Sequence, residues 1–246
     1  DKYSDRRAAY DILTLVHEQR RPLDEAIEMA KTFSTLDSLR DRAFALLIAR
    51  TALKRQGEVA SCLQALIKRA PKGKPGRAVL RLMAIGVVQI VHLGVKPHAA
   101  VDGCVQLAAE LGAPGLKGLV NAVLRRLAER QTEILAGIDP VIVNTPEWML
   151  QSWTETYGEE TARRIALANL TDPPLDITLR NGVDGWPEKL EATMLPMGSL
   201  RKRFGGMITD MPGFNEGAWW IQDAAAAIPA RLLGDIAGKT VIDLCA

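Results

Sequence analysis

The sequence predicts a multi-domain protein: an all-α domain, then a small α+β domain, and last the opening strand of a doubly wound α/β domain. Apolar residues recur at helical spacing through residues 1–135, whereas beyond residue 146 short helices alternate with candidate strands. The chain closes on an apolar run, typical of a buried parallel strand. We expect a helical domain over 1–135, a linker over 136–146, an α+β domain over 147–235 and a first strand over 236–246.

The first domain is expected to hold seven helices. Ser4 is a candidate N-cap, and Pro22 ends the helix that follows it. Gly57 permits a turn before the fourth helix, and the composition of residues 71–76 predicts a loop. The other expected helices are 23–32, 39–56, one reaching residue 69, 77–92, 98–111 after Pro97, and a last one carrying the apolar stripe Leu116, Leu119, Val120, Val123, Leu124 and Leu127.

The pattern of apolar and polar residues changes beyond residue 146. Leu175, Ile177 and Leu179 alternate with polar residues, which predicts a strand with one buried face. The remaining expected elements are helices over 146–157, 159–170, 186–195 and 223–233, short strands near 207–208 and 219–221, and a final strand over 241–246. Asp223 is the expected N-cap of the last of these helices.

Charge is distributed unevenly along the chain. The formal net charge of +2 combines a basic front part, net +8 over residues 1–137, with an acidic rear part, net −6 over 138–246. A basic front half favours a polyanionic partner. The three cysteines are far apart, which indicates reduced thiols in the cytoplasm and excludes a zinc site. The longest uncharged apolar stretch is too short to span a bilayer, so we expect no membrane partner and no metal.

Several segments form recognisable motifs. They are Lys96-Pro97-His98-Ala99-Ala100-Val101-Asp102, residues 117–126 (KGLVNAVLRR), Asn169 with Pro173-Pro174, Leu179-Arg180-Asn181, residues 222–226 (QDAAA) and Asp243-Leu244-Cys245-Ala246. Together these segments resemble bacterial ribosomal-RNA small-subunit cytosine-C5 methyltransferases that carry an N-terminal NusB-like domain. The resemblance covers nearly the whole chain and implies a NusB-like RNA-docking domain followed by the start of a Rossmann-like catalytic domain.

The resemblance implies a site for S-adenosyl-L-methionine at Cys245 and Ala246, at the end of the last strand. The alternative is that these residues are only a buried strand end. In the family the nucleophilic cysteine lies downstream of the first strand, so we expect no catalytic residue and no activity in this chain. Cys62 and Cys104 are expected to be core residues.

Basic residues are the candidate contacts to ribosomal RNA. Arg6 and Arg7 begin the first helix, an end that NusB-like folds use for RNA. Lys or Arg recurs between residues 50 and 81 with Glu58 as the sole counter-charge. Such clusters supply salt-sensitive phosphate contacts, but they also occur as solvated helix faces. The expected RNA-binding residues are Arg6, Arg7, Lys72, Lys74, Arg77, Arg180, Arg201, Lys202 and Arg203.

Three motif positions stay open at this stage. Arg125 and Arg126 are expected either to pair with a carboxylate in the domain interface, which is the favoured role, or to contact RNA, and Asn121 is a candidate cap or bridge. The alternative to an enzyme is a non-enzymatic NusB-type factor that joins RNA to a protein partner. A third hypothesis is a helical domain that binds protein, with basic residues that only keep it in solution.

Overall fold

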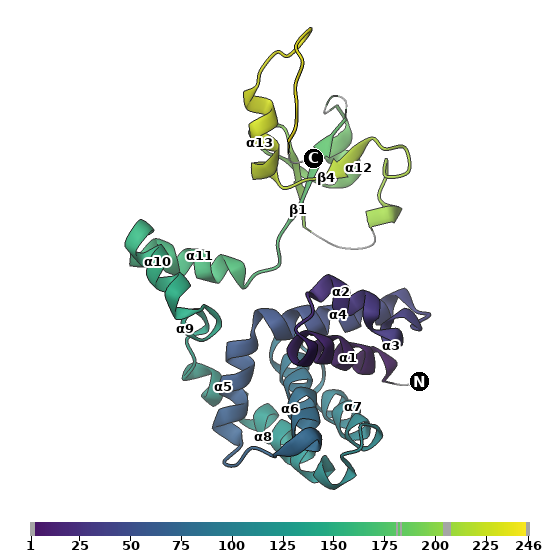
Figure 1. Cartoon of the computed structure of the whole chain (residues 1–246), viewed down its shortest axis with the longest axis vertical. Coiled ribbons are helices and arrows are strands. Elements are labelled where there is room, and N and C mark those ends of the chain that lie inside the picture. Colours follow the sequence, from purple (N-terminus) through teal and green to yellow (C-terminus); the bar gives the residue numbers. More distant parts are fainter. Residues whose placement is uncertain (1–2, 181, 183, 204–207, 245–246) are drawn as a thin grey trace. The chain divides into compact units, whose positions relative to one another are not determined.

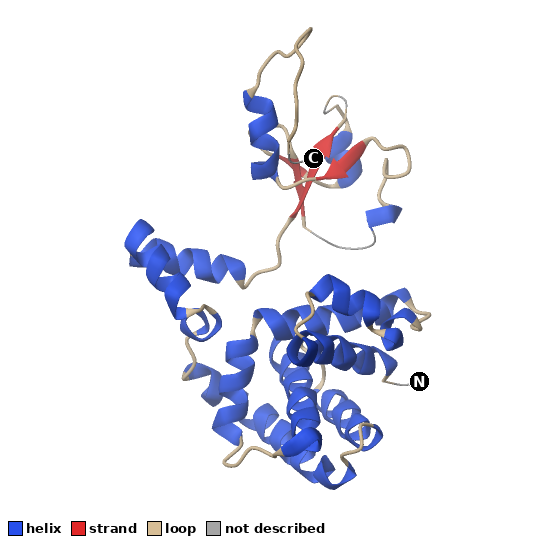
Figure 2. Ribbon diagram, viewed as in Figure 1, coloured by secondary structure: helices blue, strands red, loops and turns tan. Residues whose placement is uncertain are grey.

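The computed structural model describes residues 3–180, 182, 184–203 and 208–244. The chain divides into two compact units, Asp1–Leu170 and Thr171–Ala246, which we call the helical unit and the sheet unit (Figure 1). Strands occur only in the second of them among the described residues (Figure 2).

The helical unit contains eleven α-helices among its described residues. Their bounds are α1 Ser4–Gln19, α2 Leu23–Met29, α3 Lys31–Ser34, α4 Leu39–Lys54, α5 Gln56–Leu66, α6 Gly73–Val87, α7 Pro97–Glu110, α8 Lys117–Ala136, α9 Pro140–Asn144, α10 Glu147–Tyr157 and α11 Glu159–Asn169. A π-helical turn, η1 Val88–His92, extends α6, and a 3-10 turn, η2 Pro114–Leu116, precedes α8.

Helix α6 is the centre of this unit, as its apolar composition predicts. It contacts α1, α4, α5, α7 and α8, which surround it in Figure 1. Leu82, Met83 and Ile85 on α6 are completely buried, and so are Leu124 and Leu127 of the predicted α8 stripe. Helical periodicity therefore identified the buried faces correctly.

Several expected details of the first domain are wrong. The helix begins at Ser4 itself, so the capping position falls on Tyr3. The expected 23–32 helix is split at Ala30, whose extended backbone separates α2 from α3. The loop expected over 71–76 is helical from Gly73, because Pro75 lies in the first helical turn, where a missing N–H costs nothing.

The residues expected to form a linker, 136–146, carry α9, which packs against α5. The side-chain oxygen of Asn144 accepts hydrogen bonds from the N–H groups of Gly57 and Glu58 at 3.0 and 3.2 Å. Asn144 thereby caps α5 from another helix. Gly57 is an interior residue of α5 rather than a turn, and its Cα faces the Val143 carbonyl so closely that a Cβ would overlap it. The compact units accordingly divide after Leu170.

The sheet unit has a four-stranded antiparallel sheet in the order β2-β3-β1-β4. The strands are β1 Leu175–Leu179, β2 Thr193–Met194, β3 Leu200–Lys202 and β4 Trp219–Ile221. Two helices, α12 Trp186–Leu190 and α13 Ala224–Leu232, and a 3-10 turn, η3 Ile208–Asp210, complete the unit. Leu175, Ile177, Leu190, Leu200 and Trp219 form its core.

Strand β1 departs from the expected one-sided burial. Asp176 and Thr178 are buried as well as Leu175 and Ile177, because β1 is a central strand and Asp176 pairs with Arg201 across to β3. The strand expected near 207–208 is wrong at Ile208, which begins the 3-10 turn η3. Met207 lies outside the described residues.

The strand expected over 241–246 is not found in the part that the structure describes. Val241, Ile242 and Leu244 are exposed, and residues 241–244 pair with no strand. A parallel strand needs neighbours reached through crossover connections, and the described strands form an antiparallel sheet without it. Cys245 and Ala246 lie outside the described residues.

Candidate nucleic-acid interface

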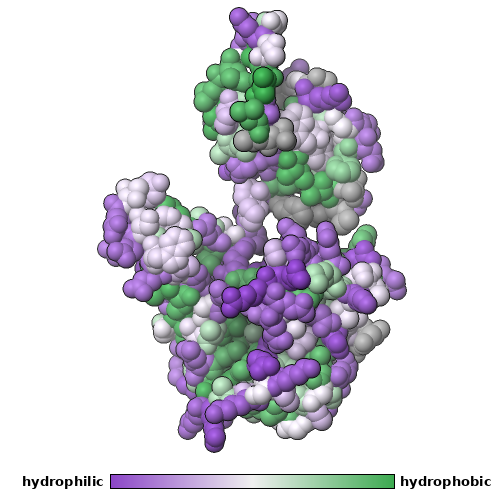
Figure 3. Space-filling model, in the orientation of Figure 1, coloured by the Kyte–Doolittle hydropathy of each residue, from purple (hydrophilic) through white to green (hydrophobic). Residues whose placement is uncertain are grey.

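Three of the basic residues expected to bind RNA come together where α6 begins. Lys72 precedes the helix, while Lys74 and Arg77 lie in its first two turns, and all three are exposed. We call these three residues the α6 patch. Hydrophilic residues cover much of the face of the helical unit seen in Figure 3. The α6 patch has the composition of a surface that contacts phosphates.

The positive charge of the α6 patch affects the pKa of the neighbouring carboxyl group of Glu18. Glu18, near the end of α1, pairs with Arg81 at 2.9 Å and lies 4.0 Å from Arg77. The hydrogen bond from Arg81, with the charges of Arg81, Arg77 and Lys74, lowers the pKa of the Glu18 carboxyl. Burial and the charge of Arg81 lower the pKa of His17. One carboxylate therefore offsets only part of a cluster of four cations.

Arg6 and Arg7, the two expected RNA contacts on α1, are less exposed than the residues of the α6 patch. Arg6 is buried, donates to Gln89 at 2.8 Å and pairs with Asp5, and its guanidinium lies over the Tyr3 and Phe44 rings. Arg7 is half-buried and pairs with Asp11. Both arginines are thus engaged within the helical unit, and the RNA contacts expected of them stay predictions.

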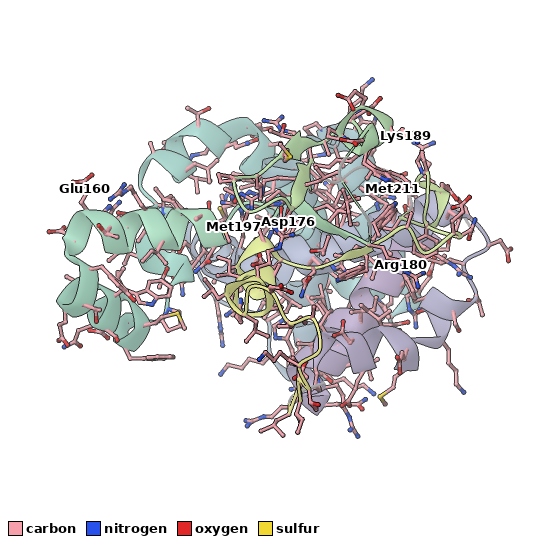
Figure 4. The ribbon with its side chains drawn as sticks, turned by 90° about the horizontal axis from the view of Figure 1, so that it is seen from above. Glu160, Asp176, Arg180, Lys189, Met197 and Met211 are labelled. Atoms are coloured by element: carbon pink, nitrogen blue, oxygen red, sulfur yellow. The ribbon has the colours of Figure 1, made fainter. Side chains whose placement is uncertain are left out.

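The basic residues of the sheet unit differ in whether other residues of the unit engage them. Arg180 is exposed just beyond β1, the strand that carries Asp176 (Figure 4). Arg201, Lys202 and Arg203, expected in a loop, instead begin on β3. Arg201 forms a bidentate pair with Asp176, with both N···O distances 2.7 Å, and Lys202 donates to the Leu190 carbonyl. Arg180 and Arg203 are therefore the two exposed candidates here that no described ion pair engages.

A second polar site lies between α7 and α8, which carry two of the family motifs. A cavity of about 370 Å³ is lined by His98 and Asp102 from α7 and by Asn121, Arg125 and Glu129 from α8. A second hollow shares His98 and Asp102 and continues to Tyr3 and Arg6 at the start of α1. The Tyr3 hydroxyl donates to the Asp102 carboxylate. We call these two connected hollows the α7–α8 groove.

The sequence analysis missed this groove. It favoured an ion pair over an RNA contact for Arg125, but within the described residues neither Arg125, Asn121 nor His98 has a side-chain partner. The available signal was the four-residue spacing of Asn121 and Arg125, which places them on one helix face. The facing helix could not be read from that spacing, because residues far apart in sequence line the groove.

The described cysteines are core residues, as expected. Cys62 and Cys104 are both buried and free. Burial raises the pKa of Cys62 to about 11 and that of Cys104 to about 12, so both remain thiols at neutral pH. Neither has the thiolate character that nucleophilic catalysis requires.

Among the residues that the structure describes, no group of three His, Cys, Asp or Glu side chains is placed to hold a metal ion. None of the described helices combines the length and apolar character needed to cross a bilayer. The two residues assigned to S-adenosylmethionine lie outside the described part, and the adjoining residues 241–244 are exposed and irregular, so the described residues form no donor set for this cofactor.

Residues 4–129 match the model of the NusB family. These residues comprise α1 to most of α8, so they include the α6 patch and the α7–α8 groove. The match covers half of the chain.

Curated relatives match well beyond these residues. The chain is 30% identical to a probable ribosomal RNA small subunit methyltransferase B of Synechocystis, over 99% of this chain and 58% of that protein. It is 30% identical to the ribosomal RNA small subunit methyltransferase B of Xylella fastidiosa, over 100% of this chain and 58% of the relative. The chain thus spans little more than half the length of these relatives.

A solved structure shares the fold. The crystal structure of PH0851 superposes with a TM-score of 0.59 at 13% sequence identity, covering 95% of this chain and 55% of that one. At this identity the likeness concerns the fold alone.

Proposed function

The chain belongs to the NusB family, and from this membership we propose that it docks RNA for a methyltransferase that acts on small-subunit (16S) ribosomal RNA. The observation that carries the proposal is the similarity to ribosomal RNA small subunit methyltransferases B across both units. A stand-alone binding factor of the NusB type would not need the sheet unit, which these matches include. The enzymatic reading is therefore favoured over a non-enzymatic factor.

We assign the reaction as methyl transfer from S-adenosyl-L-methionine to C5 of a cytosine. This assignment rests on the family resemblance of the chain. Chemistry on a base requires that the base leave its stack, and a separate docking surface can hold the surrounding RNA while this happens. The α6 patch suits that role, because its exposed cations contact phosphates without reading sequence.

The same proposal places the chemistry outside the described residues. Residues 241–246 would open the Rossmann-like domain, with Cys245 and Ala246 at the cofactor. Cys62 and Cys104 are buried thiols and supply no nucleophile.

The first test compares methyl transfer by two proteins. We expect the 246-residue chain to transfer no methyl group to small-subunit ribosomal RNA, and a full-length protein containing it to methylate a cytosine at C5. Radiolabelled methyl donor and mass spectrometry of the RNA report both results. Turnover by the 246-residue chain would refute the placement of the nucleophile, and an inactive full-length protein would refute the enzyme assignment.

The second test measures RNA affinity against salt. Substituting Lys72, Lys74 and Arg77 of the α6 patch by Gln is expected to lower the slope of log affinity against log salt by about 2, at roughly 0.7 per lost contact to single-stranded RNA. Fluorescence anisotropy with labelled RNA provides the measurement.

The matched control removes three exposed cations from α3, α4 and α11 instead: Lys31→Gln, Arg40→Gln and Arg164→Gln. Its salt slope should equal that of the unchanged chain. An equal loss in both triple variants would show a diffuse charge effect, and a flat slope for the unchanged chain would exclude phosphate-driven docking.

A further inference from the structure

The α7–α8 groove offers hydrogen-bonding groups that the fold leaves unused. Arg125 and His98 are exposed and Asn121 is half-buried, and the described part of the chain supplies none of these three side chains with a partner. Structural arginines of this unit are paired, as Arg81 is with Glu18 and Tyr10. Arg125, by contrast, presents its full set of donors to the cavity.

The floor of the cavity is apolar. Val101 is buried, Val105 and Ala128 are half-buried, and all three line the cavity. An apolar floor with a few polar groups at the edge suits a flat, partly apolar ligand. A volume of about 370 Å³ lies in the range of small-ligand sites, roughly 300–1,000 Å³.

The charges around the cavity argue against a bare phosphate. Asp102 and Glu129 face the same space as Arg125, so carboxylates outnumber the one guanidinium in the lining. A phosphate would meet repulsion from both carboxylates. A nucleobase edge instead carries donors and acceptors side by side, and it can use the guanidinium and a carboxylate together.

The surroundings of the groove fit a nucleotide chain. Lys96 is exposed and immediately precedes Pro97, which lines the cavity, so its cation can contact the phosphate that follows the base. The second hollow continues from His98 toward Tyr3 and Arg6. A neighbouring nucleotide therefore has a path along the protein surface.

We propose that the α7–α8 groove binds one unpaired base of the RNA and prefers guanine, an inference that rests on the RNA-docking function proposed above. Arg125 donates to O6 and N7 of guanine, the acceptor pair that arginine most often contacts. The Glu129 carboxylate accepts hydrogen bonds from the N1 and N2 donors of guanine. The Asn121 side-chain amide forms a hydrogen bond with a remaining polar group on the edge of the base. The base packs on Val101, Val105 and Ala128.

The test uses two labelled single-stranded RNA octamers with the 246-residue chain, one of uridines only and one with a single central guanosine. We expect the guanosine octamer to bind about tenfold more tightly, the usual value of one good bidentate base contact. Arg125→Gln should abolish this difference. The exposed position of Arg125 means that the fold is retained, which circular dichroism checks.

Arg126→Gln is the matched control, because Arg126 is the next residue of α8, is exposed, has the same charge and does not line the cavity. It should weaken both octamers equally and keep the preference for guanosine. Nuclear magnetic resonance adds a direct readout: the Asn121 side-chain amide should shift with the guanosine octamer and much less with the uridine octamer.

The possible outcomes distinguish a failure of the groove proposal from a failure of the proposed RNA-docking function. Equal, salt-dependent affinity for both octamers would overturn the groove proposal and leave RNA docking intact. The groove proposal would also be overturned if the preference for guanosine survived Arg125→Gln, or if Arg126→Gln removed it as well. An Asn121 amide signal that does not shift with the guanosine octamer would overturn it too, and would leave the groove to a protein segment. Failure to bind either octamer at low salt would overturn docking itself.

Discussion

Replacing Gly57 by Ala is expected to destabilise the helical unit by about 3 kcal/mol, at the upper end of what overpacking costs. The added Cβ would overlap the Val143 carbonyl oxygen and approach its carbonyl carbon. Since both are backbone atoms, no side-chain rotation relieves the overlap, and α9 must move away from α5. That movement breaks the hydrogen bonds that the Gly57 and Glu58 N–H groups donate to the Asn144 side-chain oxygen. Urea unfolding followed by far-ultraviolet circular dichroism measures the loss.

The control for this substitution is Gly118→Ala. Gly118 is the second residue of α8 as Gly57 is of α5, but a Cβ there would meet no atom within 4 Å. Alanine favours a helix over glycine by up to about 1 kcal/mol, so this variant should be as stable as the parent or slightly more stable. Equal stability of the two variants would contradict the close approach of α5 and α9.

Asp176→Ala is expected to destabilise the sheet unit by about 2–3 kcal/mol, somewhat less than the usual loss for a broken buried pair. The Asp176 side chain is 3% exposed, accepts two bonds from Arg201 and accepts a third from the Ala224 N–H at 3.0 Å. Its loss therefore releases β3 and the start of α13 together. The cost is reduced because the Arg201 side chain is 44% exposed and regains water.

Glu191→Gln supplies the comparison within the same unit. Glu191 forms an ion pair with Lys202 at 3.4 Å and is 87% exposed, so its removal should change stability by less than about 1 kcal/mol. Urea unfolding followed by tryptophan fluorescence reports this unit, because Trp219 is buried in it. An effect of Glu191→Gln as large as that of Asp176→Ala would show that the buried Asp176 pair stabilises the sheet unit no more than an exposed ion pair does.

The Asp176 pair also predicts a pH dependence. Hydrogen bonds from Arg201, helped by the Ala224 N–H, hold the pKa of Asp176 below its ordinary value of 3.8. A group with a lowered pKa in the folded state contributes stability that is complete above its unfolded value and is lost as pH falls through the folded one. The sheet unit should therefore weaken below about pH 4. Asp176→Asn should remove this part of the dependence, and an unchanged acid profile would contradict it.

Local sequence signals predicted most of the helical unit. The apolar residues predicted to be buried in α1, α6 and α8 lie on their buried faces, because one helix face packs on the core whatever its neighbour is. Proline at the start of α7 and Asp223 as the N-cap of α13 were also readable, since each acts on its own backbone. The Asp223 carboxylate accepts from the Ala225 N–H at 2.8 Å.

Pairings between distant segments were not readable from local signals. Strands β2 and β3 are too short to show a period, and β3 is defined by its register with β1, in which Asp176 faces Arg201. The same limit explains the wrong loop at Arg201, and it explains why the ion pair favoured for Arg125 is not found among the described residues. A charged side chain reveals its charge in the sequence, but its partner depends on which element packs beside it.

Four features followed from the residues alone: the helical front part, the change to mixed strands and helices after residue 146, the basic charge of the first part and the family motifs. Each of these depends on residues close together in the chain. The folded chain was needed to show that Asn144 caps α5, that Asp176 binds Arg201 and that His98, Asn121 and Arg125 share one groove. The physical reason is that hydrogen bonds and cavities form between side chains brought together by packing of the core, and local spacing does not specify which elements meet.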